Sequence, residues 1–255
     1  MNAALPRPVL LVTGAGRGIG AATVRRAAAA GWAVAVNYAR DAASAQALVD
    51  AVVAGGGEAA AFAADVADDA QVVALFAAVD AHFGAGRLRG LVNNAGVVAP
   101  AARVDACDAA RVRRLFEVNV FGSIACAREA LKRLSTRHGG AGGAIVNLSS
   151  VAARLGGPGE YVDYAATKGA IESFTVGLAK EVAAEGVRVN AVRPGIIDTE
   201  IHASGGRPER ARQMAKAIPM QRPGTADEVA AAIVWLLSDE AGYVSGATID
   251  VGGAR

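Results

Sequence analysis

The stretch that decides the fold is VLLVTGAGRGIG, residues 9–20. Five apolar or β-branched residues run directly into a turn with glycines at positions 14, 16, 18 and 20, and a helical pattern begins in that turn. Glycine lets a backbone turn tightly and approach a pyrophosphate, and the N–H groups at a helix start attract such an anion. The order of strand, turn and helix therefore predicts a dinucleotide-binding unit rather than a plain structural turn.

Strand-length apolar runs alternate with helical patterns along the rest of the chain. Strands are expected at 9–13, 33–38, 58–63, 88–93, 144–149, 188–192 and 247–251, and helices at 20–30, 42–54, 70–83, 109–137 and 161–185. This alternation predicts an α/β fold: a single doubly wound Rossmann domain over residues 1–255, with a seven-stranded parallel sheet and helices on both faces. The Gly- and Pro-rich segment 196–224 interrupts the rhythm and is expected to form a substrate lid.

The composition excludes several classes of partner. The 26 Lys and Arg residues nearly balance the 24 Asp and Glu residues and are scattered, which argues against a nucleic-acid partner. Apolar stretches such as 27–36 are shorter than the ~18 residues of a membrane span, and no signal-peptide pattern is present, so a cytoplasmic protein is expected. Neither a disulfide framework nor a metal site is expected from the widely spaced Cys107, Cys126, His82, His138 and His202.

Tyr164 and Lys168 form the clearest candidate for acid–base chemistry. They are four residues apart, so their side chains share one face of a helix. A free phenol titrates near pH 10, and a neighbouring ammonium is expected to lower that pKa. Tyr161 lacks such a partner, because the residue four positions later is Ala165. The pair is thus the expected general acid and base.

Six short motifs occur in one order along the whole chain: TGAGRGIG at 13–20, NNAG at 93–96, EVNVFG at 117–122, NLSS at 147–150, YAATK at 164–168 and RPG at 193–195. Together they resemble the short-chain dehydrogenase/reductase family, including 3-oxoacyl-[acyl-carrier-protein] reductases and glucose dehydrogenases. The resemblance implies hydride transfer between a nicotinamide cofactor and a small carbonyl or alcohol substrate. It also implies a homotetramer and a catalytic tetrad of Asn119, Ser150, Tyr164 and Lys168.

In that tetrad, Ser150 is expected to polarise the substrate carbonyl, with the adjacent Ser149 as the alternative. Ser150 and Tyr164 are 14 residues apart (164 − 150), one more than the commonest family spacing, so the loop 156–159 is expected to absorb an insertion. Asn119 is expected to hold a water that passes protons to Lys168. Its alternative role is to bond the helix backbone.

The cofactor is expected to be NADP(H). Relatives that use NAD carry an acidic residue near the end of the second strand, where this chain has Tyr38. Arg40 and Arg17 can instead bind a 2′-phosphate through charge-assisted hydrogen bonds. The alternative is that Arg40 pairs with the adjacent Asp41 on the surface.

The resemblance assigns further cofactor contacts. Asp65 and Val66 would contact the adenine, although Asp65 could instead cap the following helix. Lys168 would also bond the nicotinamide ribose. The complete cofactor set expected is Gly14, Arg17, Gly18, Ile19, Gly20, Tyr38, Arg40, Asp65, Val66, Asn93, Ala95, Gly96, Tyr164, Lys168, Pro194, Gly195, Ile197 and Thr199.

Several substrate hypotheses stay open. An acyl carrier protein would need a basic docking surface near the mouth of the active site, to which Arg133, Arg137 and Lys180 could contribute. A sugar or alcohol fits the C-terminal third equally well. A non-catalytic NADP sensor is the alternative outside enzymes, but the tetrad is complete. The segment 196–224 offers a set of residues that either line the substrate pocket or pack the lid: His202, Met214 and Met220.

Overall fold

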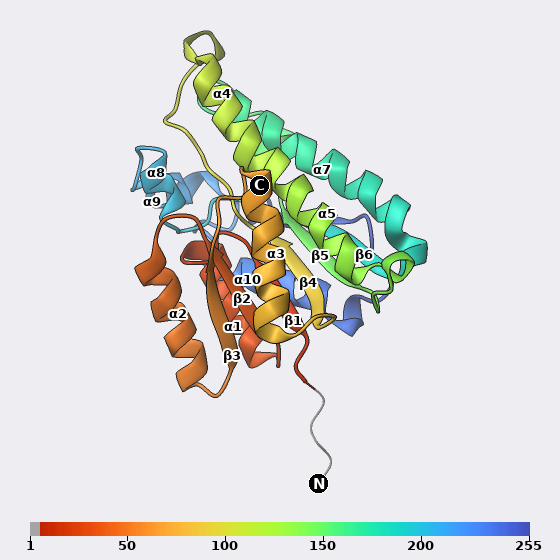
Figure 1. Ribbon diagram of the computed structural model, residues 1–255. Coiled ribbons are helices and arrows are strands. Elements are labelled where there is room, and N and C mark those ends of the chain that lie inside the picture. The colour runs from red at the N-terminus through yellow and green to blue at the C-terminus, as the bar shows by residue number, and fades with distance from the viewer. Residues whose placement is uncertain (1–5) are drawn as a thin grey trace.

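The computed structural model (Figure 1) describes residues 6–255. One seven-stranded sheet, in the order β3-β2-β1-β4-β5-β6-β7, contains strands from the whole length of this part of the chain. Every neighbouring pair is parallel. The strands are β1 (Val9–Val12), β2 (Ala33–Tyr38), β3 (Glu58–Ala63), β4 (Leu88–Asn93), β5 (Gly143–Leu148), β6 (Val187–Pro194) and β7 (Thr248–Val251).

Helices cover both faces of the sheet because its central strand, β1, is apolar on both sides. Val9 and Leu11 of β1 belong to one core, and Leu10 and Val12 belong to the other, as the alternation of a pleated strand requires. The first core also contains buried residues of α3 (Asp69–Phe83), α5 (Gly122–Leu134) and α7 (Val162–Val182). The second contains residues of α1 (Gly18–Ala29), α2 (Ala42–Ala54) and α10 (Ala226–Leu237) (Figure 1). The sequence prediction of a Rossmann-type fold is confirmed.

The sheet topology determines where a ligand can bind. β1 pairs with β2 on one side and with β4 on the other, so the strand order reverses between β1 and β4. The connections after these two strands leave in opposite directions and open a crevice at the carboxyl ends of the strands. The glycine-rich turn after β1 lies at this crevice.

Strand positions agree closely with the sequence prediction, and one helix does not. The strands predicted at 33–38, 58–63 and 88–93 have those bounds, and the other strand ends differ by one or two residues. The helix predicted at 109–137 is divided into α4 (Ala109–Phe116), a π-helical turn at Glu117–Phe121, α5 and a short 3₁₀ turn at Thr136–His138. Helix α10 was not predicted; its start is marked by a capping box of Thr225 and Glu228.

The segment 196–224 leaves the sheet and returns to its starting point. Gly224 N–H donates to Ile196 O at 2.9 Å, and Asp198 N–H donates to Gly224 O at 2.9 Å. Between these closing bonds lie α8 (Ile201–Ser204), α9 (Arg210–Met214) and a 3₁₀ turn at Ala215–Ala217 (Figure 1). The segment therefore forms a closed excursion held at its base, the form expected for a substrate-covering loop.

Candidate active site

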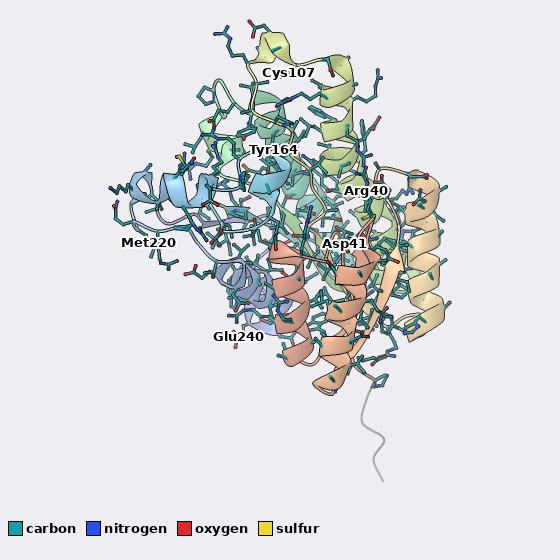
Figure 2. The ribbon with its side chains drawn as sticks, turned by 90° about the vertical axis from the view of Figure 1, so that its left-hand side faces the viewer. Arg40, Asp41, Cys107, Tyr164, Met220 and Glu240 are labelled. Carbon is teal, nitrogen blue, oxygen red and sulfur yellow. The ribbon has the colours of Figure 1, made fainter. Side chains whose placement is uncertain are left out.

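A cavity of about 1180 Å³ extends along the carboxyl ends of the strands. Its walls combine the glycine-rich turn, the loops after β2, β3, β4, β5 and β6, the start of α7 and part of the segment 196–224. Figure 2 shows Tyr164 within the molecule, and Arg40 and Asp41 together beside the start of α2. The predicted residues that line this cavity are Gly14, Arg17, Gly18, Ile19, Tyr38, Arg40, Asp65, Val66, Ala95, Gly96, Ser150, Tyr164, Lys168, Pro194, Gly195, Ile197 and Thr199.

The glycine-rich turn forms a surface that a pyrophosphate fits. Gly14 and Gly18 have φ angles of 58° and 55°, a region that favours glycine. A Cβ at Gly14 would come within 2.9 Å of Ala95 Cα, and a Cβ at Gly20 within 2.8 Å of Gly14 O. Gly20 thus packs beneath the turn and does not line the cavity, while α1 begins at Gly18 and directs its N-terminus toward the cavity.

Two arginines on this part of the wall have free guanidinium groups. Arg17 and Arg40 are exposed and, within residues 6–255, neither side chain makes a hydrogen bond or an ion pair. The alternative pairing of Arg40 with Asp41 is not formed. Asp41 instead caps α2, accepting from Ser44 Oγ at 2.6 Å and Ser44 N at 3.0 Å, and these bonds lower the pKa of its carboxyl group.

Asp65 does not cap the helix that follows it. The N-cap of α3 is Asp68, whose carboxylate accepts from Ala70 and Gln71 N–H groups. Asp65 accepts from Ala67 N–H at 3.0 Å and from Arg114 Nη2 at 3.0 Å. Burial raises the pKa of Asp65, but these two hydrogen bonds outweigh burial and the pKa falls. The capping alternative is therefore wrong.

Arg114 is a cavity residue that the sequence reasoning missed. It lies on α4, about 50 positions from its partner Asp65, and nothing in its local sequence distinguishes it from the neighbouring Arg113. Only the packing of α4 beside the loop after β3 brings the guanidinium to the cavity. No local signal could have identified it.

Asn93 supports the sheet and does not line the cavity. Its Nδ2 donates to Ser123 O at 3.0 Å and to Asn147 Oδ1 at 2.9 Å, which ties β4 to α5 and β5. The next residue, Asn94, donates through Nδ2 to Thr13 O and Gly14 O, at 2.8 and 2.9 Å. Asn94 therefore fixes the glycine-rich turn against β4, a role that the sequence reasoning did not assign.

The two adjacent serines have different environments. Ser149 borders the cavity but is buried, and its hydroxyl donates to Glu172 Oε1 at 2.6 Å. Ser150 lines the cavity, accepts from Ala152 N–H at 3.1 Å, and lies near enough to Tyr164 for its hydroxyl to act on the phenol pKa, which it lowers. This geometry favours Ser150 as the serine that meets a substrate.

Tyr164 and Lys168 meet as the helical spacing predicted. Lys168 Nζ lies 5.6 Å from the centre of the Tyr164 ring and donates to Leu148 O at 2.7 Å. The expectation that the ammonium lowers the phenol pKa is wrong for this structure. Burial raises the pKa of Tyr164 to about 12, despite the opposing effect of the Ser150 hydroxyl, and burial lowers the pKa of Lys168 to about 8. Both shifts favour the uncharged forms.

Asn119 lies in the π-helical turn between α4 and α5 and is buried. Its Oδ1 accepts from Val97 N–H at 2.8 Å, and its Nδ2 donates to Val97 O at 3.0 Å and Thr167 Oγ1 at 3.1 Å. It does not line the cavity. Gly96 lies between Asn119 and Lys168, since a Cβ there would be 3.5 Å from Asn119 Oδ1 and 3.6 Å from Lys168 Nζ.

The segment after β6 covers the glycine-rich turn. Pro194, Gly195, Ile197 and Thr199 line the cavity, and a Cβ at Gly18 would lie 3.6 Å from Thr199 Cβ. Farther along, Met214 lines the same cavity. Met220 is exposed and lines a smaller neighbouring cavity, while the side chain of His202 lies outside the described part of the structure.

Two ion pairs at the cavity were not predicted. Arg111 of α4 donates from Nε to Asp163 Oδ2 at 2.6 Å, and Asp163 also accepts from Tyr164 N–H at 2.9 Å. Arg210 of α9 donates to Glu160 at 2.7 Å, which joins the segment 196–224 to the loop before α7. Both pairs link elements distant in sequence, so local patterns could not reveal them.

The basic residues proposed for carrier docking do not lie near the cavity. Arg133 and Arg137 lie where α5 ends and the chain enters β5, and Lys180 lies where α7 ends before β6. These are the amino ends of the strands, opposite the cavity. Arg133 also pairs with Asp80 at 2.7 Å and has little exposed surface. These three residues therefore do not form a docking surface at the mouth of the active site.

Comparison with known proteins agrees with this geometry. Residues 14–253 match a family model described as Enoyl-(Acyl carrier protein) reductase. The chain is 53% identical over 247 residues to the oxidoreductase YgfF of Escherichia coli, covering 97% of this chain and 99% of that protein. This chain belongs to the short-chain dehydrogenase/reductase family.

Other short-chain dehydrogenases/reductases are similar over their full length. A 3-oxoacyl-[acyl-carrier-protein] reductase of Synechocystis is 38% identical, covering 98% of this chain and 97% of that protein. A solved short-chain dehydrogenase/reductase of Serratia marcescens superposes with a TM-score of 0.88 at 34% identity, covering 97% of each chain. The chain is thus an oxidoreductase of a family that uses a nicotinamide cofactor and acts on small molecules.

Two absences apply to residues 6–255 as described. No helix there is long and apolar enough to cross a membrane. No group of three or more His, Cys, Asp and Glu side chains in this part of the chain is arranged to hold a metal ion.

Proposed function

We propose that this protein is an NADP(H)-dependent reductase that converts a carbonyl group to a secondary alcohol. The observation that carries the proposal is the group formed by Ser150, Tyr164 and Lys168: two neighbouring hydroxyls and an amine beside the same ring, all on the wall of one cavity. A carbonyl oxygen placed against Ser150 and Tyr164 would meet two O–H donors.

The nicotinamide, when bound, supplies the hydride that adds to the carbonyl carbon. Tyr164 donates the proton that the carbonyl oxygen then requires, so the substrate gains one hydride and one proton. Its raised pKa keeps the phenol protonated at neutral pH, which suits a proton donor. Ser150 donates to the same oxygen as negative charge develops, and Lys168 stabilises the phenolate left on Tyr164.

The chain's choice of NADP(H) is supported by the charges at the end of β2. Arg17 and Arg40 line the cavity with free guanidinium groups, and Tyr38 occupies the position where an acid would repel a 2′-phosphate. A phosphate between two guanidinium groups receives charge-assisted, directional hydrogen bonds. Asp65 and Val66 would then contact the adenine, with Arg114 beside them.

The residues without a cavity surface take supporting roles in this proposal. Gly20 and Asn93 hold the turn and the sheet in place, and Asn119 holds the loop after β4 against α7. Because all polar atoms of the Asn119 amide have protein partners, a water relay through this residue would start from its backbone or its neighbours. The segment 196–224 would serve as the substrate lid of a single domain.

The homotetramer is proposed from the family resemblance and from exposed apolar side chains on neighbouring helices. Phe121 is 61% exposed, and Ile124 and Val176 are also exposed. Such side chains on adjacent helices are suited to a contact between copies. Light scattering in solution tests this directly, and a monomeric mass would contradict it.

The test of function is a substrate panel followed at the absorbance band of the reduced cofactor. Simple ketones, 3-oxoacyl thioesters and keto sugars are each offered with NADPH and with NADH at equal concentration. We expect ketone reduction with a clear preference for NADPH. A preference for NADH would contradict the cofactor assignment, and exclusive use of carrier-bound acyl groups would favour the second candidate, a 3-oxoacyl-carrier reductase like the Synechocystis relative.

A further inference from the structure

The cavity wall contains two buried guanidinium nitrogens without a hydrogen-bond partner. In the described residues, three buried side-chain atoms have no partner: Asn93 Oδ1, Arg210 Nη1 and Arg255 Nη1. Asn93 lies within the sheet, whereas Arg210 and Arg255 both line the cavity that holds Tyr164. A buried donor on a charged group is costly when unpaired, so it calls for an acceptor.

The charged groups around Arg210 include more positive than negative charge. Its Nη2 donates to Glu160 at 2.7 Å, and its guanidinium carbon lies 5.1 Å from the centre of the Tyr161 ring. Arg207 forms a second ion pair with the same carboxylate. Two guanidinium groups therefore share one carboxylate, and the pKa of Glu160 is lowered by the bond from Arg210. The three charged groups together carry one positive charge in excess, and of the two arginines Arg210 is the one that lines the cavity.

Arg255 approaches the same region from another element. Its N–H donates to Gly252 O at 3.3 Å, and a Cβ at Gly252 would lie 3.2 Å from Val151 Cγ1. Val151 directly follows Ser150, and Tyr161 precedes Tyr164 by about one helical turn. The two arginines thus line the same cavity as Ser150 and Tyr164, one from α9 and one from the residues after β7.

We propose that the substrate carries an anionic oxygen group, a carboxylate or a phosphate, that Arg210 and Arg255 bind while Ser150 and Tyr164 receive its carbonyl oxygen. The inference rests on the proposed function for the second half of this statement. Both residues line the cavity, and each keeps one guanidinium nitrogen without a protein partner, so a ligand's anionic oxygen in the cavity is the acceptor that we assign to them. An arginine fork matches the geometry of a carboxylate or a phosphate.

The experiment uses pairs of ketones of which one member carries an anionic group and the other is neutral. 5-Oxohexanoate is compared with its methyl ester, and dihydroxyacetone phosphate with dihydroxyacetone. Affinity is measured by calorimetry on the NADP⁺ complex, which has no hydride to transfer, and kcat/KM is measured separately with NADPH. The variants are Arg210→Met and Arg255→Met. The control is Arg212→Met, on the same helix, where the arginine is 76% exposed and pairs with Glu209 on the surface.

We expect the wild-type protein to bind at least one anionic ketone roughly 10- to 100-fold more tightly than its neutral counterpart, the effect of one charge-assisted hydrogen bond. Arg210→Met and Arg255→Met should each lower the ratio of anionic to neutral affinity, a ratio that cancels any general effect on ketone binding, and Arg212→Met should preserve it. The preferred pair identifies carboxylate or phosphate as the group. Equal affinity for charged and neutral ketones in the wild-type protein overturns the inference.

Failure of the proposed function gives a different result. If the anionic ketone binds with the predicted dependence on Arg210 but no NADPH is consumed with any ketone, the anion site stands and carbonyl reduction is contradicted. If neutral ketones are reduced at rates equal to those of the acids and Arg210→Met changes neither, reduction stands and the anion site is contradicted.

Discussion

Lys168 Nζ lies 5.6 Å from the centre of the Tyr164 ring while it donates a 2.7 Å hydrogen bond to Leu148 O. The ammonium is thereby held beside the phenol without bonding to it. Burial favours the uncharged form of both side chains. It raises the pKa of Tyr164 to about 12 and lowers the pKa of Lys168 to about 8. Tyr164 is thus a protonated donor at every ordinary pH, and Lys168 is the member that titrates in the assay range.

The pH dependence of carbonyl reduction follows from this assignment. Lys168 is charged below pH 8 and loses its proton as the pH rises through about 8. The charged form stabilises the phenolate that proton transfer leaves on Tyr164, so kcat/KM for reduction should be high below pH 8 and fall above it. The profile is measured with saturating NADPH. A rate that stays level from about pH 6 to pH 10 would show that Lys168 does not control the proton step.

Arg40 should determine the cofactor preference. Arg40→Ala removes a free guanidinium from the cavity wall, and we expect the Kd for NADPH to rise roughly 10-fold or more while the Kd for NADH changes little. Binding is measured by fluorescence titration of each reduced cofactor. Arg25→Ala is the control, because Arg25 is exposed on α1 and does not line the cavity. Equal weakening of both cofactors would refute a 2′-phosphate contact.

Asn119 should matter more for stability than its position in a catalytic motif suggests. Asn119→Ala removes two hydrogen bonds to the part-buried backbone of Val97 and one to the buried Thr167. We expect the free energy of unfolding to fall by about 2–3 kcal/mol. Urea unfolding checks this, with Arg113→Ala on the exposed side of α4 as the comparison. An unfolding curve identical to that of the wild type would exclude the anchoring role.

Glu172 links the serine loop to the last strands of the sheet. It accepts from Ser149 Oγ at 2.6 Å and from both Nε and Nη2 of Arg193 at 2.7 Å, in a mostly buried setting. Glu172→Leu should lower the free energy of unfolding by about 2–3 kcal/mol, since it leaves buried donors unpaired. Asp105→Leu, which breaks the exposed pair with Arg103, should cause no measurable change. Equal effects of the two substitutions would contradict this account.

The features that could be predicted from the sequence are those that depend on residues close together in the chain. The glycine turn, the alternating strands and the four-residue spacing of Tyr164 and Lys168 all depend on nearby residues, and the structure confirms the fold that they predict. The ion pairs between residues distant in the sequence could not be predicted from local patterns. Arg114 meets Asp65, and Arg210 meets Glu160, only because α4 and α9 pack beside distant loops.

Burial was the other quantity that the sequence could not supply. The phenol pKa expected from Lys168 alone was too low, because the desolvation of Tyr164 depends on the surrounding cavity walls. The π-helical turn at Glu117–Phe121 was also missed, since its residues have the same apolar spacing as an ordinary helix. The serine ambiguity likewise needed geometry, which separates Ser149 from Ser150 by their partners.

The most direct test of the central claim is turnover and NADPH binding measured side by side in Tyr164→Phe. The substitution removes the phenol hydroxyl near Ser150 and keeps the ring beside Lys168. The account predicts that NADPH binds with an affinity close to that of the wild-type protein while ketone reduction falls by at least about 100-fold, the contribution typical of a positioned proton donor. Reduction at the wild-type rate would contradict it.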